Sequence, residues 1–355
     1  MELSIFDSNL LHIAIVDVFD SCIWTDRYCG YGDFEIYTAM TSNMRNLLQA
    51  DRYLTYKDSD HVMIIEDRQV ASDIENGDHL IVTGRSLESI LERRIIWGQT
   101  VLTGNLQNGI QKLLNENAIS PTVVARAIPN LVFEASTDPI ITALTIDAQF
   151  TGDNLYDTIK KLCSVNDIGF KITLTDTGLL VFKLYAGIDR SYAQVLNPYV
   201  VFSRKNENII NTNSLESKKD LKTVALVAGE GEGATRKTET VEINPGGYSG
   251  LSRRETFTDA RDISSTISGR TLTAAEYTAQ LKQRGVEDLA SKIIIKSFEG
   301  KADTLHMYKY GEDFFMGDIV QLTDDYGSEF TERVTEMVIS QSTSGTSANP
   351  TFSIV

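Results

Sequence analysis

The stretch CIWTDRYCGYGDFEIYT, residues 22–38, decides the fold class, because its pattern is repeated by the sequence on both sides. Phe34 and Ile36 alternate with polar neighbours directly after a glycine-rich turn at residues 30–32. Alternation at period two, with turn residues between short runs, is typical of antiparallel β-strands. Similar runs occupy residues 1–98, so the sequence predicts a sheet that closes toward a β-barrel there.

The middle of the chain changes to helical spacing. Apolar residues recur at intervals of three and four over 105–120 and 152–167, and a hairpin pattern with a TDTG turn follows. We expect Asn105 and Asp153 to cap the two helices. These elements predict a peripheral α+β domain over residues 99–187.

Strand patterns return after residue 187 and continue toward the end of the chain. One long run of good helix formers interrupts them at about 271–297. The predicted fold class is therefore mainly β with α+β insertions. Its three parts are a first β-barrel at 1–98, the α+β domain at 99–187, and a second β-barrel region with a helical insertion at 188–355.

The net charge limits the possible partners. The 33 Lys and Arg residues against 49 Asp and Glu residues leave a net charge of −16. Such acidity disfavours wrapping of nucleic acid, which needs clustered cations, and binding to an anionic membrane surface. No apolar run approaches the ~18–20 residues of a membrane span, and the start has no secretory signal pattern. We expect synthesis in a cytoplasm, no membrane span and no sequence-specific binding of nucleic acid.

Signs of reaction chemistry are weak. The four histidines, His12, His61, His79 and His306, each stand alone in a strand pattern. Cys163 lies on the apolar stripe of a predicted helix, where a buried side chain is favoured over a thiol nucleophile. The spacings of zinc sites and EF-hand loops are not found. We predict no enzymatic centre, no cofactor and no metal site.

Three segments are less generic than their surroundings. They are the opening stretch, GRSLESILERRI at 84–95, and a late Gly-Asp-x-Val strand. In order and spacing, and together with RRETFTDARDIS at 253–264, they resemble the baseplate hub of tailed bacteriophages, including the structural N-terminal region of tail-associated lysins. The residues that carry the resemblance are Trp24, Arg27, Tyr28, Gly32, Asp33, Phe34, Gly84, Arg85, Leu87, Leu91, Arg93, Arg254, Glu255, Gly317 and Asp318.

The resemblance implies a virion tail-tip protein with two related β-barrels in each subunit of a homotrimer. The trimer would join the hexameric tail tube, built of a tail tube or distal tail protein, to a spike or fibre protein. A tape measure protein is a further expected partner. Acidity then suits a DNA channel that repels phosphate. The chain ends at Val355 without room for a peptidase or glycosidase domain, so we expect a structural protein and no enzyme.

Two other function classes stay open. One is a cell-wall hydrolase that uses Cys163 or a pair of carboxylates. The other is a carbohydrate-binding adhesin built on the tyrosines and tryptophans.

Overall fold

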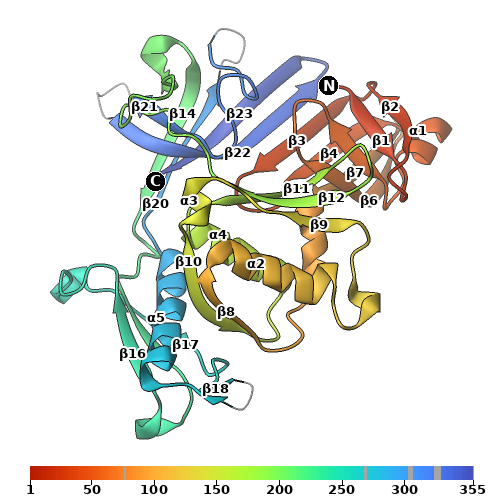
Figure 1. Ribbon diagram of the computed structural model, residues 1–355. Helices are drawn as coiled ribbons and strands as arrows, with labels where there is room; N and C mark the ends of the chain where they lie inside the picture. Colours follow the sequence, from red (N-terminus) through yellow and green to blue (C-terminus); the bar gives the residue numbers. More distant parts are fainter. Residues whose placement is uncertain (76, 268–269, 303–306, 324–328, 355) are drawn as a thin grey trace.

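One long β-sheet dominates the computed structural model, which describes residues 1–75, 77–267, 270–302, 307–323 and 329–354 (Figure 1). Within these residues 13 strands join in the order β14-β20-β23-β22-β3-β4-β7-β6-β5-β1-β2, and β21 and β13 extend it beside β22. The predicted mainly β character is confirmed. The strand pairings of the described residues follow an open path, so two closed barrels are not established.

The N-terminal part of the sheet comes from β1 to β7. Inward side chains such as Trp24, Ile36 and Leu80 alternate with outward ones and form one core. The bounds are β1 Leu3–Phe6, β2 His12–Val16, β3 Ser21–Arg27, β4 Asp33–Ala39, α1 Ser42–Leu47, β5 Tyr53–Tyr56, β6 Val62–Asp73, β7 Gly77–Ser86 and the 3-10 helix η1 Leu87–Arg93.

Antiparallel pairing of β3 with β22 joins the two ends of the chain in this sheet. Arg27 lies opposite Glu336, and Ser21 lies opposite Ser342. Phe202 and Phe352 belong to a separate core beneath the C-terminal strands. The bounds are β13 Val201–Ser203, η4 Arg204–Asn206, β14 Ile209–Ser217, β20 Ile295–Ala302, β21 Ile319–Thr323, β22 Glu329–Ser342 and β23 Gly345–Ile354.

The middle part packs two helices against small sheets around a third core. Asn105 caps α2 as expected, because its side chain accepts the Asn108 N–H at 3.1 Å. The bounds are β8 Thr100–Asn105, α2 Leu106–Leu114, the π-helical η2 Asn115–Ile119, η3 Val124–Arg126, β9 Leu131–Glu134, α3 Pro139–Thr142, β10 Thr145–Phe150, α4 Leu155–Val165, β11 Gly169–Leu174 and β12 Leu180–Tyr185.

The predicted cap of α4 is wrong by one residue. The Asn154 side chain accepts the Tyr156 and Asp157 N–H groups at 2.9 and 3.3 Å. The Asp153 carboxylate instead accepts the Thr151 N–H at 3.3 Å, because it lies one position too early to reach the first turn.

A small module projects from the main body (Figure 1). It is a three-stranded sheet, β16-β15-β17, covered on one side by α5, with Val227 and Leu281 in its core. The long helix predicted near 271–297 is confirmed as Ala274–Ala290. The other bounds are β15 Val224–Ala228, η5 Gly233–Thr235, β16 Thr238–Glu242, η6 Gly250–Ser252, β17 Glu255–Asp259, β18 Thr266–Ile267 and β19 Arg270–Thr271.

No helix in the described part of the chain has the length and apolar character of a membrane span.

Candidate functional site

The opening stretch and the GRS segment lie side by side in the main sheet. Phe34 pairs with Trp24 on one side and with Gly84 on the other. A Cβ at Gly84 would lie 1.8 Å from the Ile64 carbonyl oxygen, so only glycine fits at this position of β7. The structure therefore brings together Trp24, Phe34 and Gly84, three of the residues singled out in the sequence.

Two arginines of these segments are each held between carboxylates. Arg27 lies 2.5 Å from Asp33 and 2.6 Å from Glu336 of β22. Arg85 contacts Glu66 at 2.7 Å and Glu92 at 2.6 Å. The guanidinium charges are therefore neutralised within the chain, and the Arg27 contacts bridge the N- and C-terminal strands.

Tyr28 lies where all three parts of the chain meet. Its backbone N–H donates to the Thr335 carbonyl at 3.0 Å, and its hydroxyl donates to the Asp167 carbonyl at 2.9 Å. The ring packs on Gly169 and on Gly317, where an added Cβ would approach Tyr28 Cε2 to 2.6 and 2.2 Å. Gly317 also has φ +89°, a conformation that favours glycine.

Asp318, the neighbour of Gly317, is a buried anchor. Its carboxylate accepts the backbone N–H groups of Ile188 at 2.7 Å and Phe315 at 3.0 Å, and it contacts Arg190 Nε at 2.7 Å. The Gly-Asp turn thus fixes residues 188–190, the segment that connects the middle part to the C-terminal strands.

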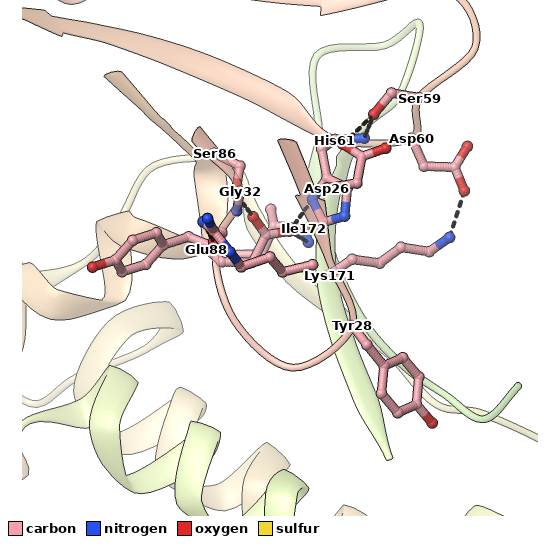
Figure 2. A network of polar contacts seen from close by, with 12 residues as sticks. Asp26, Tyr28, Gly32, Ser59, Asp60, His61, Ser86, Glu88, Lys171 and Ile172 are labelled. Atoms are coloured by element: carbon pink, nitrogen blue, oxygen red, sulfur yellow. Dashed lines mark hydrogen bonds and ion pairs between the residues drawn. The ribbon is translucent and has the colours of Figure 1, made fainter. Parts of the chain in front are cut away.

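A buried polar network connects the N-terminal strands to the β11–β12 hairpin (Figure 2). The carboxylate of Glu88, which is fully buried, accepts the Ile172 N–H at 2.6 Å and the hydroxyl proton of Ser86. Ser86 in turn accepts the Gly32 N–H at 2.7 Å. Gly32 is therefore linked to the hairpin through two side chains.

His61 extends this network toward a second buried carboxylate. Its Nδ1 lies 3.3 Å from Glu88 Oε1. Asp26 Oδ1 accepts hydrogen bonds from Trp24 Nε1 at 2.9 Å and from Ser59 Oγ at 2.8 Å. Ser59 Oγ also accepts the His61 N–H at 3.1 Å, so Ser59 connects the two groups.

The charges in this network depend on one another. Burial alone would lower the pKa of His61, but the carboxylates of Glu88 and Asp26 outweigh it and raise the pKa to about 9. Burial alone would raise the pKa of Glu88, yet His61, Ser86 and the Ile172 N–H together lower it. Burial raises the pKa of Asp26. An imidazolium beside Glu88 is thus the favoured state at neutral pH.

A cavity of about 600 Å³ opens beside His61. Its walls come from all three parts of the chain and include Asp26, Lys171, Tyr185 and Tyr310. At the wall formed by β11, Lys171 Nζ contacts Asp60 at 2.5 Å (Figure 2). The same Nζ lies 5.0 Å from the centre of the Tyr185 ring.

The remaining sequence-selected residues divide into two groups. Leu87 and Leu91 are fully buried in the core of the middle part, and Arg93 of the same segment is exposed. Arg254 and Glu255 lie apart, at the start of β17 in the projecting module. The structure does not bring these two residues to the place near Tyr28 where the three parts of the chain meet.

Glu88, His61 and Asp26 were missed by sequence reasoning. Glu88 lies inside a segment that was singled out, but its charge was typical of an exposed helix face. His61 follows an Asp-rich turn and carried no ligand spacing. The one available signal was the apolar run Val62–Ile65, which indicates burial immediately after His61.

Cys163 is fully buried, as its position on the apolar stripe predicts. Burial raises the pKa of its thiol well above the ordinary value. A thiolate nucleophile at this position is therefore disfavoured.

Comparison with known families identifies the chain. The family model described as Siphovirus ReqiPepy6 Gp37-like protein matches residues 2–352. The chain belongs to this family. The resemblance to phage tail proteins that the sequence motifs indicated is confirmed.

Three solved structures share the fold over nearly the whole chain. A tail protein of Neisseria meningitidis MC58 is 13% identical, with a TM-score of 0.57 over 99% of this chain and 96% of that one. The 43 kDa tail protein of prophage MuSo2 from Shewanella oneidensis is 10% identical, with a TM-score of 0.60 over 99% and 98%. Prophage tail protein gp18 of Listeria monocytogenes EGD-e is 13% identical, with a TM-score of 0.56 over 99% and 94%. No curated protein sequence matches the chain.

Proposed function

We propose that the chain is a structural, non-enzymatic subunit of a phage tail tip. In this proposal it forms a homotrimeric baseplate hub that joins the hexameric tail tube to a distal spike or fibre. The two barrel-like β units are residues 1–98 and 188–355, and residues 99–187 form the peripheral unit. A tail tube or distal tail protein and a tape measure protein are the proposed neighbours.

The observation that carries the proposal is the continuous sheet formed where β3 pairs with β22. One of its faces covers the two β cores, and the other is turned away from them. Because side chains alternate along a strand, this outward face can be read from the register. It includes Ser21, Ile23, Arg27, Asp33, Glu35, Tyr37, His79, Arg85, Glu336, Val338, Ser340 and Ser342.

The cations of this outward face are held by carboxylates. Arg27 and Arg85 each have two acidic partners. The strands β3, β4, β7, β22 and β23 contain no lysine. A phosphate backbone would find few unpaired cations there, which suits a channel through which DNA passes without binding.

Light scattering on the purified chain tests the proposed assembly. We expect a mass three times that of the 39.4 kDa subunit and, in electron micrographs, a ring with threefold symmetry. Co-expression with the tube, tape measure and spike proteins of the same particle should give a complex. A monomer that persists at high concentration, with and without these proteins, would contradict the hub.

A further inference from the structure

Three arginines lie close together where the end of η1 meets η3. Arg93 and Arg94 stand at the end of η1, and Arg126 ends η3. Arg94 Nε donates to the Arg126 carbonyl at 2.6 Å, and Arg126 Nη2 donates to the Ile95 carbonyl at 2.6 Å. Within the described part of the chain, none of the three guanidinium groups forms an ion pair with a carboxylate. Such a cluster is unusual in a chain with a net charge of −16.

Like charges are crowded in this cluster. Burial, and then the charges of its two arginine neighbours, lower the pKa of Arg94. Glu66 and Glu92 lie near Arg93, but both carboxylates are already bound by Arg85, at 2.7 and 2.6 Å. An anionic group from another molecule would therefore relieve a repulsion that the chain itself leaves in place.

An exposed tryptophan adjoins the arginines. Trp97 is 66% exposed, and its ring centre lies 4.7 Å from Arg126 Cζ. The buried Asn117 Oδ1 accepts the Trp97 N–H at 3.1 Å and Arg126 Nη2 at 3.3 Å, which fixes the two residues against each other. Ile95 and Val124, which are 44% and 81% exposed, add apolar surface. We define the Arg-Trp patch as Arg93, Arg94, Ile95, Trp97, Val124 and Arg126.

The composition of the Arg-Trp patch suits a contact with another protein. Tryptophan and arginine contribute most of the binding energy at many protein interfaces. A surface that is already held by hydrogen bonds also loses little conformational entropy when a partner binds. The patch therefore has both the residue types and the rigidity of a binding site.

Charge and apolarity together favour an acidic protein segment as the partner. Carboxylates would pair with the guanidinium groups, and an apolar side chain would pack on Trp97 and Val124. A phosphate backbone supplies the charge but no apolar group, and a net charge of −16 repels a long polyanion. A second copy of the chain carries the same −16 and is repelled in the same way. We propose that the Arg-Trp patch binds an acidic segment of a partner protein, with an apolar side chain among its carboxylates.

Quenching of tryptophan fluorescence tests the charge of the patch without any partner. The chain has two tryptophans, and Trp24 is fully buried, so a quencher in solution reaches Trp97. Relative to free N-acetyltryptophanamide, iodide should quench the protein better than caesium does, although the net charge of the chain attracts caesium. Arg93→Glu should lower this preference for iodide about twofold. A preference for caesium in the wild type would overturn the proposal.

Arg45→Glu is the matched control for Arg93→Glu. Both arginines are exposed, and neither side chain forms an ion pair within the described residues. Arg45 lies on α1, outside the Arg-Trp patch. The control should keep the wild-type preference for iodide, and an equal loss in both variants would mean that iodide senses the whole chain and not the patch.

Synthetic peptides test the class of partner. In fluorescence anisotropy, a labelled eight-residue peptide that alternates glutamate and leucine should bind the wild type. It should bind more tightly than peptides that alternate glutamine with leucine or glutamate with serine, and more tightly than an eight-nucleotide single-stranded DNA. Arg93→Glu should weaken binding about fivefold and Trp97→Ala by about tenfold or more, whereas Arg45→Glu should not. No binding of the first peptide at about 1 mM, or tighter binding of the DNA, would overturn the proposal.

Light scattering separates this proposal from the proposed trimer. Arg93→Glu and Trp97→Ala should keep the mass of the wild type, because the partner is not a second copy. Loss of the trimer in these variants would show that a second copy covers the patch, and the proposed partner would be wrong. A monomeric wild type that still binds the glutamate–leucine peptide would refute the hub and support the Arg-Trp patch.

Discussion

At the scale of single residues, Glu88 and His61 make the stability of the fold depend on pH. The pKa of folded His61 is raised from 6.5 to about 9, so its stabilising contribution is complete below pH 6.5 and is lost as the pH rises through 9. The pKa of folded Glu88 is lowered from 4.5, so its contribution is present above pH 4.5 and is lost at lower pH. The pair therefore stabilises the fold most between pH 4.5 and 6.5.

His61→Gln should remove the loss of stability on the alkaline side. We expect the free energy of unfolding of the wild type to fall by up to about 3 kcal/mol between pH 6.5 and 10, because two buried carboxylates lose their cation. Urea unfolding at a series of pH values measures this slope. The control His79→Gln, at a half-buried site beside Asp20, should retain it. Equal slopes in wild type and His61→Gln would refute the assignment.

Gly317→Ala tests the contact with Tyr28. Gly311 is the matched control, because it has a similar φ of +84° against +89°, but a Cβ there would meet no atom within 4 Å. Both substitutions should destabilise the fold by about 1 kcal/mol through the backbone. Gly317→Ala should lose a further ~1–3 kcal/mol through overpacking against the ring. Thermal unfolding compares the two variants, and equal losses would mean that Tyr28 yields without penalty.

At the scale of elements, the start of α4 separates two neighbouring polar residues. Asn154→Ala should cost about 1 kcal/mol, because it leaves the Tyr156 and Asp157 N–H groups without their cap. The same variant also loses the bond from Asn154 Nδ2 to the Glu92 carbonyl at 2.9 Å. Asp153→Ala should change the unfolding free energy by less than half as much. The reverse order in chemical unfolding would restore Asp153 as the cap.

Some of these elements can be predicted from the sequence, and others cannot. The hairpin around TDTG and the helices α2, α4 and α5 were predictable, because their periodicity is contained in one short segment. The pairing of β3 with β22 was not, since Arg27 and Glu336 are 309 positions apart and no local pattern records their register.

The candidate site was only partly predictable, for a related reason. Gly84 and Gly317 were singled out because their segments resemble those of the phage hub family, and the structure adds that both mark a close approach of neighbouring atoms. Glu88 could not be singled out, because a carboxylate that is buried beside an imidazolium reads in sequence like one that faces water.

At the scale of the whole molecule, the paired arginines predict how the protein meets DNA. The wild type should not retard duplex DNA in gels at low salt, because its face at β3 and β22 has its cations neutralised. The double variant Asp33→Asn with Glu336→Gln frees Arg27, so at the lowest salt it should retard DNA more than the wild type does. The double variant Asp157→Asn with Asp176→Asn removes the same charge from exposed positions in the middle part and should behave like the wild type. Retardation by the wild type would argue against a channel lined by this face.

The pairing of β3 with β22 also has a consequence for synthesis. A ribosome adds about 5–20 residues per second, so β3 waits roughly 15–60 s before the strand that completes its edge is made. During that interval the nascent chain exposes an unpaired strand edge beside an unfinished core, a state that favours misassembly between chains. Long-range pairing of this kind also slows folding itself. The native sheet can therefore assemble only when synthesis of the chain is nearly complete. We expect chaperones that shield nascent strands to raise the yield of folded protein.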